Sequence, residues 1–289
     1  MIEIISYHEF KGNNTAIVDN EFNKLLENIK SQYPNVEVLS LQCSEDEDEK
    51  EITPTIHPNE NIEEEELYSK LAEIKIKFNS LKEYIEYCLK YGADLDVLEP
   101  SKLKISSKEF GECIGIIINF FKEFCSKYNI AFNVQLNNEN EEIDIEKLKK
   151  GIYDEDELYE LEQDSDLKKF IIVFEGIGKN EEDLIKKIIL TLNPEIIVHK
   201  ITTKKLQLDD KIPVGDNFHG LIKVEMFCSI LDIVEIAYKY LPIVISLQNE
   251  NIELSTLDLQ DIGNDIGGAI FELSHGVLER ELNALNQMK

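Results

Sequence analysis

The chain has 289 residues, of which 58 are acidic and 30 basic, giving a formal net charge of −28. So acidic a chain is repelled by phosphate backbones and anionic membranes, and Arg280 is its one arginine, the side chain that grips phosphate bidentately. We therefore expect neither nucleic acid nor membrane as a partner, although 43% hydrophobic residues are enough for a globular core.

The N-terminal residues predict a soluble, cytoplasmic protein. Glu3 comes early and no basic segment precedes an apolar run, so the start does not resemble a signal peptide. The longest apolar stretch, residues 113–121, is too short to cross a bilayer. The five cysteines are widely spaced without a C-x-x-C pair, which favours buried thiols over a zinc site. We expect no metal and no cofactor.

The first half begins with a predicted strand, helix and strand, the helix being closed by Pro34. An acidic loop is predicted next, followed by a long inserted helix that ends at Gly92. After Gly92 an extended segment, a helix and a final strand are predicted in that order. The expected ranges are strands 2–10 and 35–42, helix 20–34, loop 44–66, inserted helix 67–92, extended residues 93–106, helix 107–129 and strand 130–136.

The second half follows an acidic linker, residues 137–166, in which one short helix ending at Gly151 is predicted. Its expected strands are 169–176, 195–208, 221–227 and 242–248, and its expected helices are 180–194 and 229–241. A C-terminal helix is predicted over 257–289. The glycines at 263, 267 and 268 indicate either that this helix starts near Asn264 or that it closely approaches another element.

The βαββαβ order of the second half is that of the ferredoxin-like split βαβ. With residues 44–92 removed, the first half has the same order, and Pro34 and Pro194 stand at matching helix exits. The segments 126–143 and 238–254 also resemble each other. We therefore predict an α+β protein of two tandem ferredoxin-like modules, residues 1–136 and 167–256, the first carrying the inserted helix, and then the helix 257–289.

A candidate ligand site lies where strand 169–176 meets the following helix. Gly176, Gly178 and Asn180 stand there, and strand–helix turns of this kind can bind phosphate. The turn has neither G-x-G-x-x-G nor G-K-[ST], and nearby carboxylates oppose an anion, which favours a tight structural turn. In ferredoxin-like sensory domains of the ACT kind the same loop can hold a small ligand, so we keep these three residues as weak ligand-binding candidates.

The histidines do not form a metal-binding pattern. His199 and His219 are expected at opposite ends of one hairpin, and His8, His57 and His275 are isolated in sequence. No nucleophile elbow or cysteine-nucleophile signature occurs, so no catalytic residue is assigned.

One local resemblance is carried by `YCLKYGADLDVLEPSKLK`, residues 87–104. It is similar to the closing segment of WYL-domain regulators, in which a helix leads into a Gly-Ala-Asp-x-x-Val-Leu-x-Pro strand. The likeness covers fewer than twenty residues and implies a helix–strand junction at Gly92. It carries no functional implication, because the chain has no tryptophan.

Composition and motifs favour a non-catalytic scaffold that binds another protein or itself through the acidic loops or the inserted helix. A small-molecule-sensing regulatory protein of the ACT-like kind is the first alternative. An enzyme of unrecognised type, with its site in a cleft, is the second.

Overall fold

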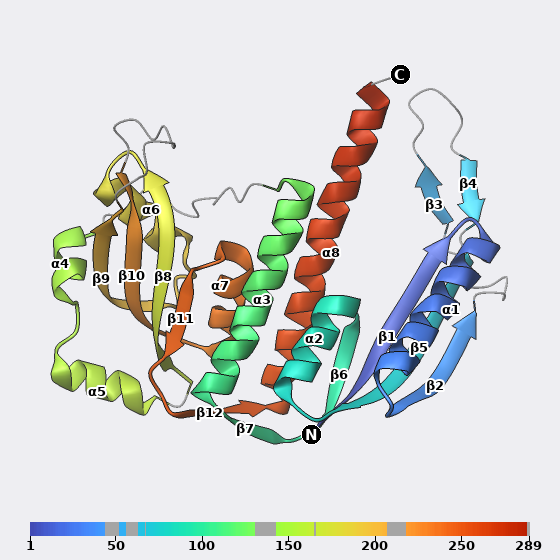
Figure 1. Ribbon diagram of the computed structural model, residues 1–289, viewed down its shortest axis with the longest axis horizontal. Coiled ribbons are helices and arrows are strands. Elements are labelled where there is room, and N and C mark those ends of the chain that lie inside the picture. Colours follow the sequence, from blue (N-terminus) through green and yellow to red (C-terminus); the bar gives the residue numbers. More distant parts are fainter. Residues whose placement is uncertain are drawn as a thin grey trace. The chain divides into compact units, whose positions relative to one another are not determined.

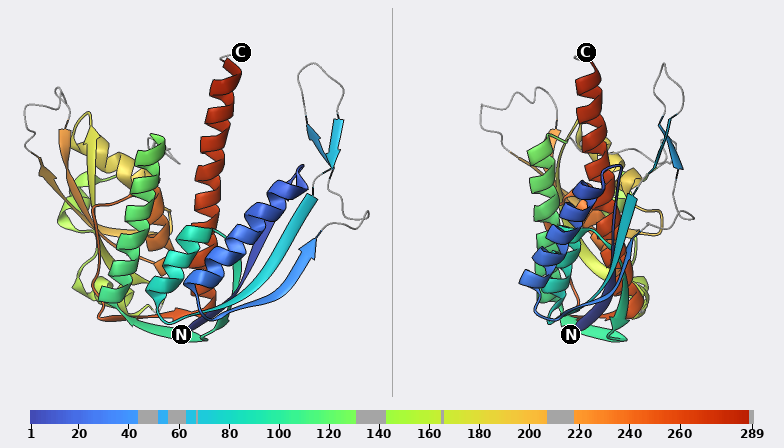
Figure 2. Two further views of the ribbon diagram at one scale, coloured as in Figure 1. Left: turned by 45° about the vertical axis from the view of Figure 1, so that its right-hand side comes forward. Right: turned by 90° about the vertical axis from the view of Figure 1, so that its right-hand side faces the viewer.

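The computed structural model describes residues 1–43, 52–55, 63–66, 68–130, 143–164, 166–206 and 218–287. The chain is an α+β protein, as predicted, and its elements are shown in Figures 1 and 2. It divides into two compact units. The first comprises Met1–Leu103 and Ser255–Gly268, and the second comprises Lys104–Leu254 and Ala269–Lys289.

The first unit contains a four-stranded sheet in the order β2-β5-β1-β6, in which every neighbouring pair is antiparallel. The two helices α1 and α2 pack on one face of this sheet (Figure 1). Strands β3 and β4 pair antiparallel within the predicted acidic loop. The bounds are β1 Ile2–Gly12, α1 Thr15–Gln32, β2 Val36–Cys43, β3 Ile52–Thr55, β4 Glu63–Glu66, β5 Tyr68–Phe78, α2 Leu81–Tyr91 and β6 Asp94–Glu99.

The core of the first unit follows from two periodicities. Alternate residues of β1 and β5 point to the helical face, because side chains alternate along a strand. One stripe of α1, spaced by three and four residues, meets them. The buried residues of this layer are Ile2 and Ile4 of β1, Ala72, Ile74, Ile76 and Phe78 of β5, and Val18, Phe22, Leu26 and Ile29 of α1.

The prediction of one long inserted helix over residues 67–92 was wrong. Residues 68–78 form β5 and only residues 81–91 are helical. Strand β5 lies between β1 and β2, so the first sheet is not built from residues 2–42 and 94–136. The junction at Gly92 is confirmed: α2 ends at Tyr91, Gly92 caps it in the left-handed region with φ 53°, and β6 begins at Asp94.

The predicted helix 107–129 is confirmed as α3, Ser107–Tyr128, but it belongs to the second unit. It contacts α7 and β11 there. Of the strand predicted at 130–136, residues 131–136 lie outside the part of the chain that the structure describes.

The second unit contains a four-stranded antiparallel sheet in the order β11-β8-β10-β9. Helices α6 and α7 cover one of its faces (Figures 1 and 2). Every strand and helix predicted between residues 169 and 248 is present. The bounds are β8 Lys168–Gly178, α6 Glu181–Thr191, β9 Ile197–Lys205, β10 Phe218–Cys228, α7 Ile230–Tyr240 and β11 Val244–Leu247.

The described part of the acidic segment before β8, residues 143–164, contains two helices. Helix α4, Ile145–Lys150, ends at Gly151 as expected, and Ile145 and Leu148 are buried. A second helix, α5 (Glu155–Gln163), was not predicted; a capping box between Asp154 and Glu157 begins it. The segment was expected to stay solvated because like charges repel, but α4 buries its two apolar residues near β9.

Three further elements complete the chain. Strands β7, Lys102–Ser106, and β12, Asn251–Ser255, form a two-stranded sheet. Helix α8 runs from Thr256 to Gln287. It passes straight through its glycines, and a Cβ at Gly263 would overlap the Tyr84 hydroxyl and stand 2.8 Å from Leu95 Cδ2. Close approach to another element, not a late helix start, therefore explains Gly263.

Three pairs of corresponding elements in the two units are equal in length, β1 and β8, β5 and β10, and α2 and α7. Strands β1, β5, β8 and β10 each contain 11 residues, and α2 and α7 each contain 11. Ser80 and Ser229 are the N-caps of these two helices, each accepting from a backbone N–H three residues on. Gly92 and Leu241 end them with φ of 53° and 46°.

Candidate functional site

The turn between β8 and α6 holds the three residues singled out in the sequence. Asn180 is the N-cap of α6, and its Oδ1 accepts from the Asp183 N–H at 2.8 Å. A Cβ at Gly176 would stand 2.9 Å from Leu184 Cδ1, and one at Gly178 would stand 3.0 Å from Leu184 Cβ. Both glycines thus let α6 pack closely on β8, so Leu184 occupies the space above them.

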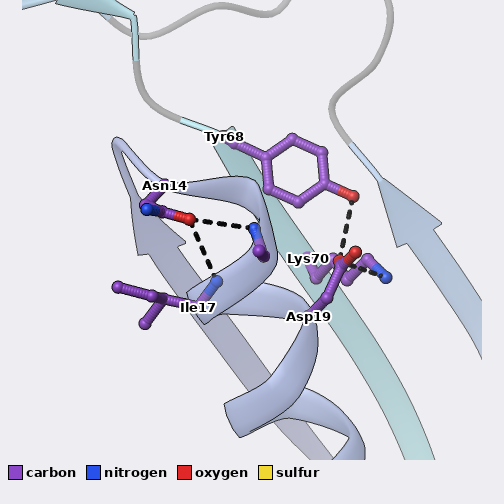
Figure 3. Close-up of polar contacts among 6 residues, drawn as sticks. Asn14, Ile17, Asp19, Tyr68 and Lys70 are labelled. Atoms are coloured by element: carbon purple, nitrogen blue, oxygen red, sulfur yellow. Dashed lines mark hydrogen bonds and ion pairs between the residues drawn. The ribbon is translucent and has the colours of Figure 1, made fainter.

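The turn between β1 and α1 has the same construction. Gly12 ends an 11-residue strand, and Asn14, two residues on, caps the helix by accepting from Ala16 N–H and Ile17 N–H. A Cβ at Gly12 would stand 3.1 Å from Val18, which follows Gly12 by the same interval as Leu184 follows Gly178. The cap is drawn in Figure 3.

Beside this first turn lies a polar cluster of Asp19, Tyr68 and Lys70. In Figure 3 the Asp19 carboxylate points from α1 toward the start of β5. Lys70 Nζ lies 2.7 Å from Asp19 Oδ1, and the Tyr68 hydroxyl donates to the same oxygen at 3.4 Å. Lys70 also lies over the Phe22 ring at 5.6 Å. The cluster fixes the N-terminal part of α1 against β5.

Three polar side chains meet inside the core of the first unit: Ser6, His8 and Tyr87. The distances are 2.6 Å from Ser6 Oγ to the Tyr87 hydroxyl, 2.9 Å from that hydroxyl to His8 Nε2, and 3.1 Å from His8 Nε2 to Ser6 Oγ. All three are buried. Burial lowers the pKa of His8 to about 4, so the imidazole is neutral at pH 7.

His199 and His219 lie toward opposite ends of the β9–β10 hairpin, as predicted, and both are buried. His219 Nε2 lies 2.7 Å from Glu175 Oε1 on the neighbouring strand. His199 Nδ1 accepts from the Tyr153 N–H at 3.3 Å, and burial lowers the pKa of His199. His57 lies outside the described residues.

One face of the second sheet lies opposite the face that α6 and α7 cover. The register places Val244, Val173 and Lys223 side by side on it, and Ile171 beside Glu225 in the next row. Leu221 and Ile177 continue the aliphatic surface toward His219. Among these residues Ile177 and Val244 are exposed. The face therefore carries aliphatic side chains on β8 and β11 next to charged side chains on β10.

A groove of about 440 Å³ lies between α4, the end of α6 and the start of β9. Its wall is mostly aliphatic, with Asp144, Lys147 and Asn193 as polar groups. A groove of this volume is large enough for a small molecule. Sequence reasoning missed it, because α4 had been assigned to a solvated linker.

Over the described ranges, no group of three or more His, Cys, Asp or Glu side chains is arranged to hold a metal ion. In the same part of the chain, none of the helices is both long and apolar enough to cross a membrane.

A family model, described as the MJ0538 family, matches residues 3–280. The chain belongs to the MJ0538 family. It is also similar to the uncharacterized protein MJ0538 of Methanocaldococcus jannaschii, with 42% identity over 282 residues, which cover 97% of this chain and 100% of that protein. No solved structure matches the chain. The family relationship is therefore established over nearly the whole length of the chain.

Proposed function

We propose that this member of the MJ0538 family is a non-catalytic protein-interaction scaffold made of two ferredoxin-like modules that arose by internal duplication. Each four-stranded sheet belongs to a βαββαβ run, if β3 and β4 are set aside in the first unit. When the strands are numbered 1 to 4 within each run, both sheets have the order 2-3-1-4. Equal strand lengths, the Asn14 and Asn180 caps and the Ser80 and Ser229 caps support the duplication.

The observation that carries the scaffold proposal is the face of the second sheet opposite α6 and α7, where Ile177 and Val244 are exposed. Antiparallel sheets commonly leave one face to solvent, and that face is then mostly polar. Here Val173, Val244 and Ile177 contribute an aliphatic surface, bordered by Lys223 and Glu225. Exposed aliphatic side chains next to charged ones are common on protein-binding surfaces.

Nucleic acid is not the partner we propose for this face. Single-stranded RNA binds such a sheet by stacking its bases on aromatic side chains of the two central strands. At the corresponding places β8 carries Ile171 and Val173, and β10 carries Leu221 and Lys223. With a net charge of −28, the chain also lacks the excess of cations that phosphate binding requires. We accordingly propose a protein partner in the cytoplasm.

The experiment is affinity capture from native extract with the whole chain and with Val244→Lys and Ile177→Lys. Ile17→Lys, which changes an exposed isoleucine of α1, is the matched control. We expect a partner that the wild type and Ile17→Lys retain and that both sheet variants lose. A partner retained by all four proteins would contradict the sheet face as the binding surface.

The small-molecule alternative has its own observation, the groove beside α4. A metabolite that raises the melting temperature of the wild type but not of Leu148→Trp, which fills the groove, would favour this alternative. The ACT-like loop has less support, because Leu184 packs above Gly176 and Gly178.

A further inference from the structure

The second half of α8 carries a row of apolar side chains on its outer side. Phe271 is 71% exposed and Leu278 is 57% exposed, although both are large. His275 lies between them, and its ring stacks on that of Phe271 at 6.1 Å with an interplanar angle of 7°. The contact is made within α8, one turn apart, and it leaves most of the Phe271 side chain exposed.

The spacing of this row is that of a coiled-coil seam. Residues 271, 275 and 278 are separated by four and three positions, and Leu282 and Leu285 continue the same alternation in the sequence. A four–three repeat of apolar residues keeps one seam of a helix facing a partner helix. The opposite row, Ile270, Leu273 and Val277, is half-buried, so the helix presents a second apolar face to the outside.

The charge around the seam identifies the partner. From Ile266 to Lys289 there are three acidic residues and two basic ones, so this stretch has a net charge of −1, against −28 for the whole chain. A basic partner would be attracted to the acidic remainder of the molecule and not to this stretch. Two copies of so acidic a chain repel each other least where the local charge is almost balanced.

We propose that the seam formed by Phe271, His275 and Leu278 pairs with the same seam of a second copy, so that the protein self-associates through α8. A second copy carries a seam of matching spacing, and pairing would remove two large apolar side chains from water in each chain. This surface is separate from the sheet face proposed above, and either proposal can fail without the other.

The test is sedimentation velocity of the full-length chain up to about 100 µM, a range that detects the micromolar dissociation constants of weak dimers. We expect the wild type to dimerise with concentration and Phe271→Lys and Leu278→Lys to stay monomeric. Ile17→Lys is the matched control, because Ile17 is 61% exposed and lies on α1, outside the seam. It should dimerise like the wild type.

Far-UV circular dichroism of all four proteins should be the same, since each substituted side chain is exposed. A wild type that remains monomeric over the whole range would overturn the proposal. So would a dimer that persists in both seam variants, because its interface would then lie elsewhere.

Discussion

Asn264 on α8 holds Leu95 on β6 by two hydrogen bonds. Its Oδ1 accepts from the Leu95 N–H at 2.9 Å, and its Nδ2 donates to the Leu95 carbonyl at 3.3 Å. One turn earlier, Gln260 Oε1 accepts from the Val97 N–H at 3.2 Å. Strand β6 is at the edge of the first sheet, so these amides replace the missing neighbour strand.

The geometry of the two elements makes this match possible. Four residues of an α-helix rise about 6 Å, and two residues of a strand extend about 6.6 Å. Side chains at 260 and 264 therefore meet the backbone at 97 and 95 when the helix runs beside the strand in the opposite direction. The edge is closed by a helix, which leaves it unable to pair with a strand of another molecule.

Replacing Asn264 by alanine should open this edge. We expect a loss of about 1–3 kcal/mol, because a part-buried N–H and C=O lose their partners. Hydrogen exchange at Leu95 should become faster by a corresponding factor, while exchange in β10 of the second unit should not change. Glu272→Ala, an exposed change on the same helix, serves as the control. Unaltered protection of Leu95 in Asn264→Ala would show that the amide contributes nothing.

Two glycines of α8 should respond in opposite ways to alanine. At Gly263 the new methyl would meet Tyr84, whose hydroxyl donates to the Leu259 carbonyl at 2.6 Å, and we expect a loss of about 1–3 kcal/mol. At Gly268 the methyl would meet nothing within 4 Å, and better helix propensity should add about 0.5–1 kcal/mol. Melting temperatures of the two variants test this, and shifts of the same sign would refute it.

The buried His8 should make the first unit sensitive to mild acid. Its folded-state pKa is about 4, below that of an unfolded histidine, so between those values only the unfolded chain binds the proton. Stability is then present above about pH 6.5 and is lost as pH falls toward 4, by about 3 kcal/mol in all. His8→Phe should flatten this dependence in urea unfolding measured from pH 7 to pH 4.5.

Tyr87→Phe provides the comparison. Burial raises the pKa of Tyr87, so its hydroxyl does not ionise in this range, and the variant should lose about 1 kcal/mol equally at every pH. An unchanged acid slope in His8→Phe would assign the pH dependence to other groups. His199, whose pKa burial also lowers, is then the next candidate.

Removal of either asparagine cap should lower the free energy of unfolding by a similar amount. Asn14→Ala and Asn180→Ala each leave first-turn N–H groups without an acceptor, for about 1 kcal/mol. Asn14→Ser and Asn180→Ser keep an acceptor and should stay near the wild type. Thermal unfolding distinguishes the pairs. A large loss at Asn180 together with a negligible one at Asn14 would count against equivalent turns.

The second sheet was predictable because its signals are local. Ser229 and Asn180 cap their helices, Pro194 ends one, and apolar residues alternate along β10. The first sheet was mispredicted at β5, which lies within the range 67–92 predicted to be one helix. The alternation Ala72, Ile74, Ile76, Phe78 was the available signal, and Ser80 marked the start of α2.

The candidate site was less accessible to sequence reasoning. Ser6 and His8 are two residues apart on β1, but Tyr87 is far along the chain, and only the packing of α2 on the sheet brings them together. The same holds for Gly263, whose neighbours Tyr84 and Leu95 come from other elements. No local pattern contains such contacts.

The first unit is discontinuous, and this bears on how the chain emerges from the ribosome. Strand β6 is complete once residue 99 has been made, yet the helix that closes its edge begins at Thr256. All of residues 104–254 must be synthesised in between. During that interval the N–H groups of Leu95 and Val97 on β6 have no acceptor from α8. Until α8 has been made, the open edge of β6 can pair with a strand of another molecule.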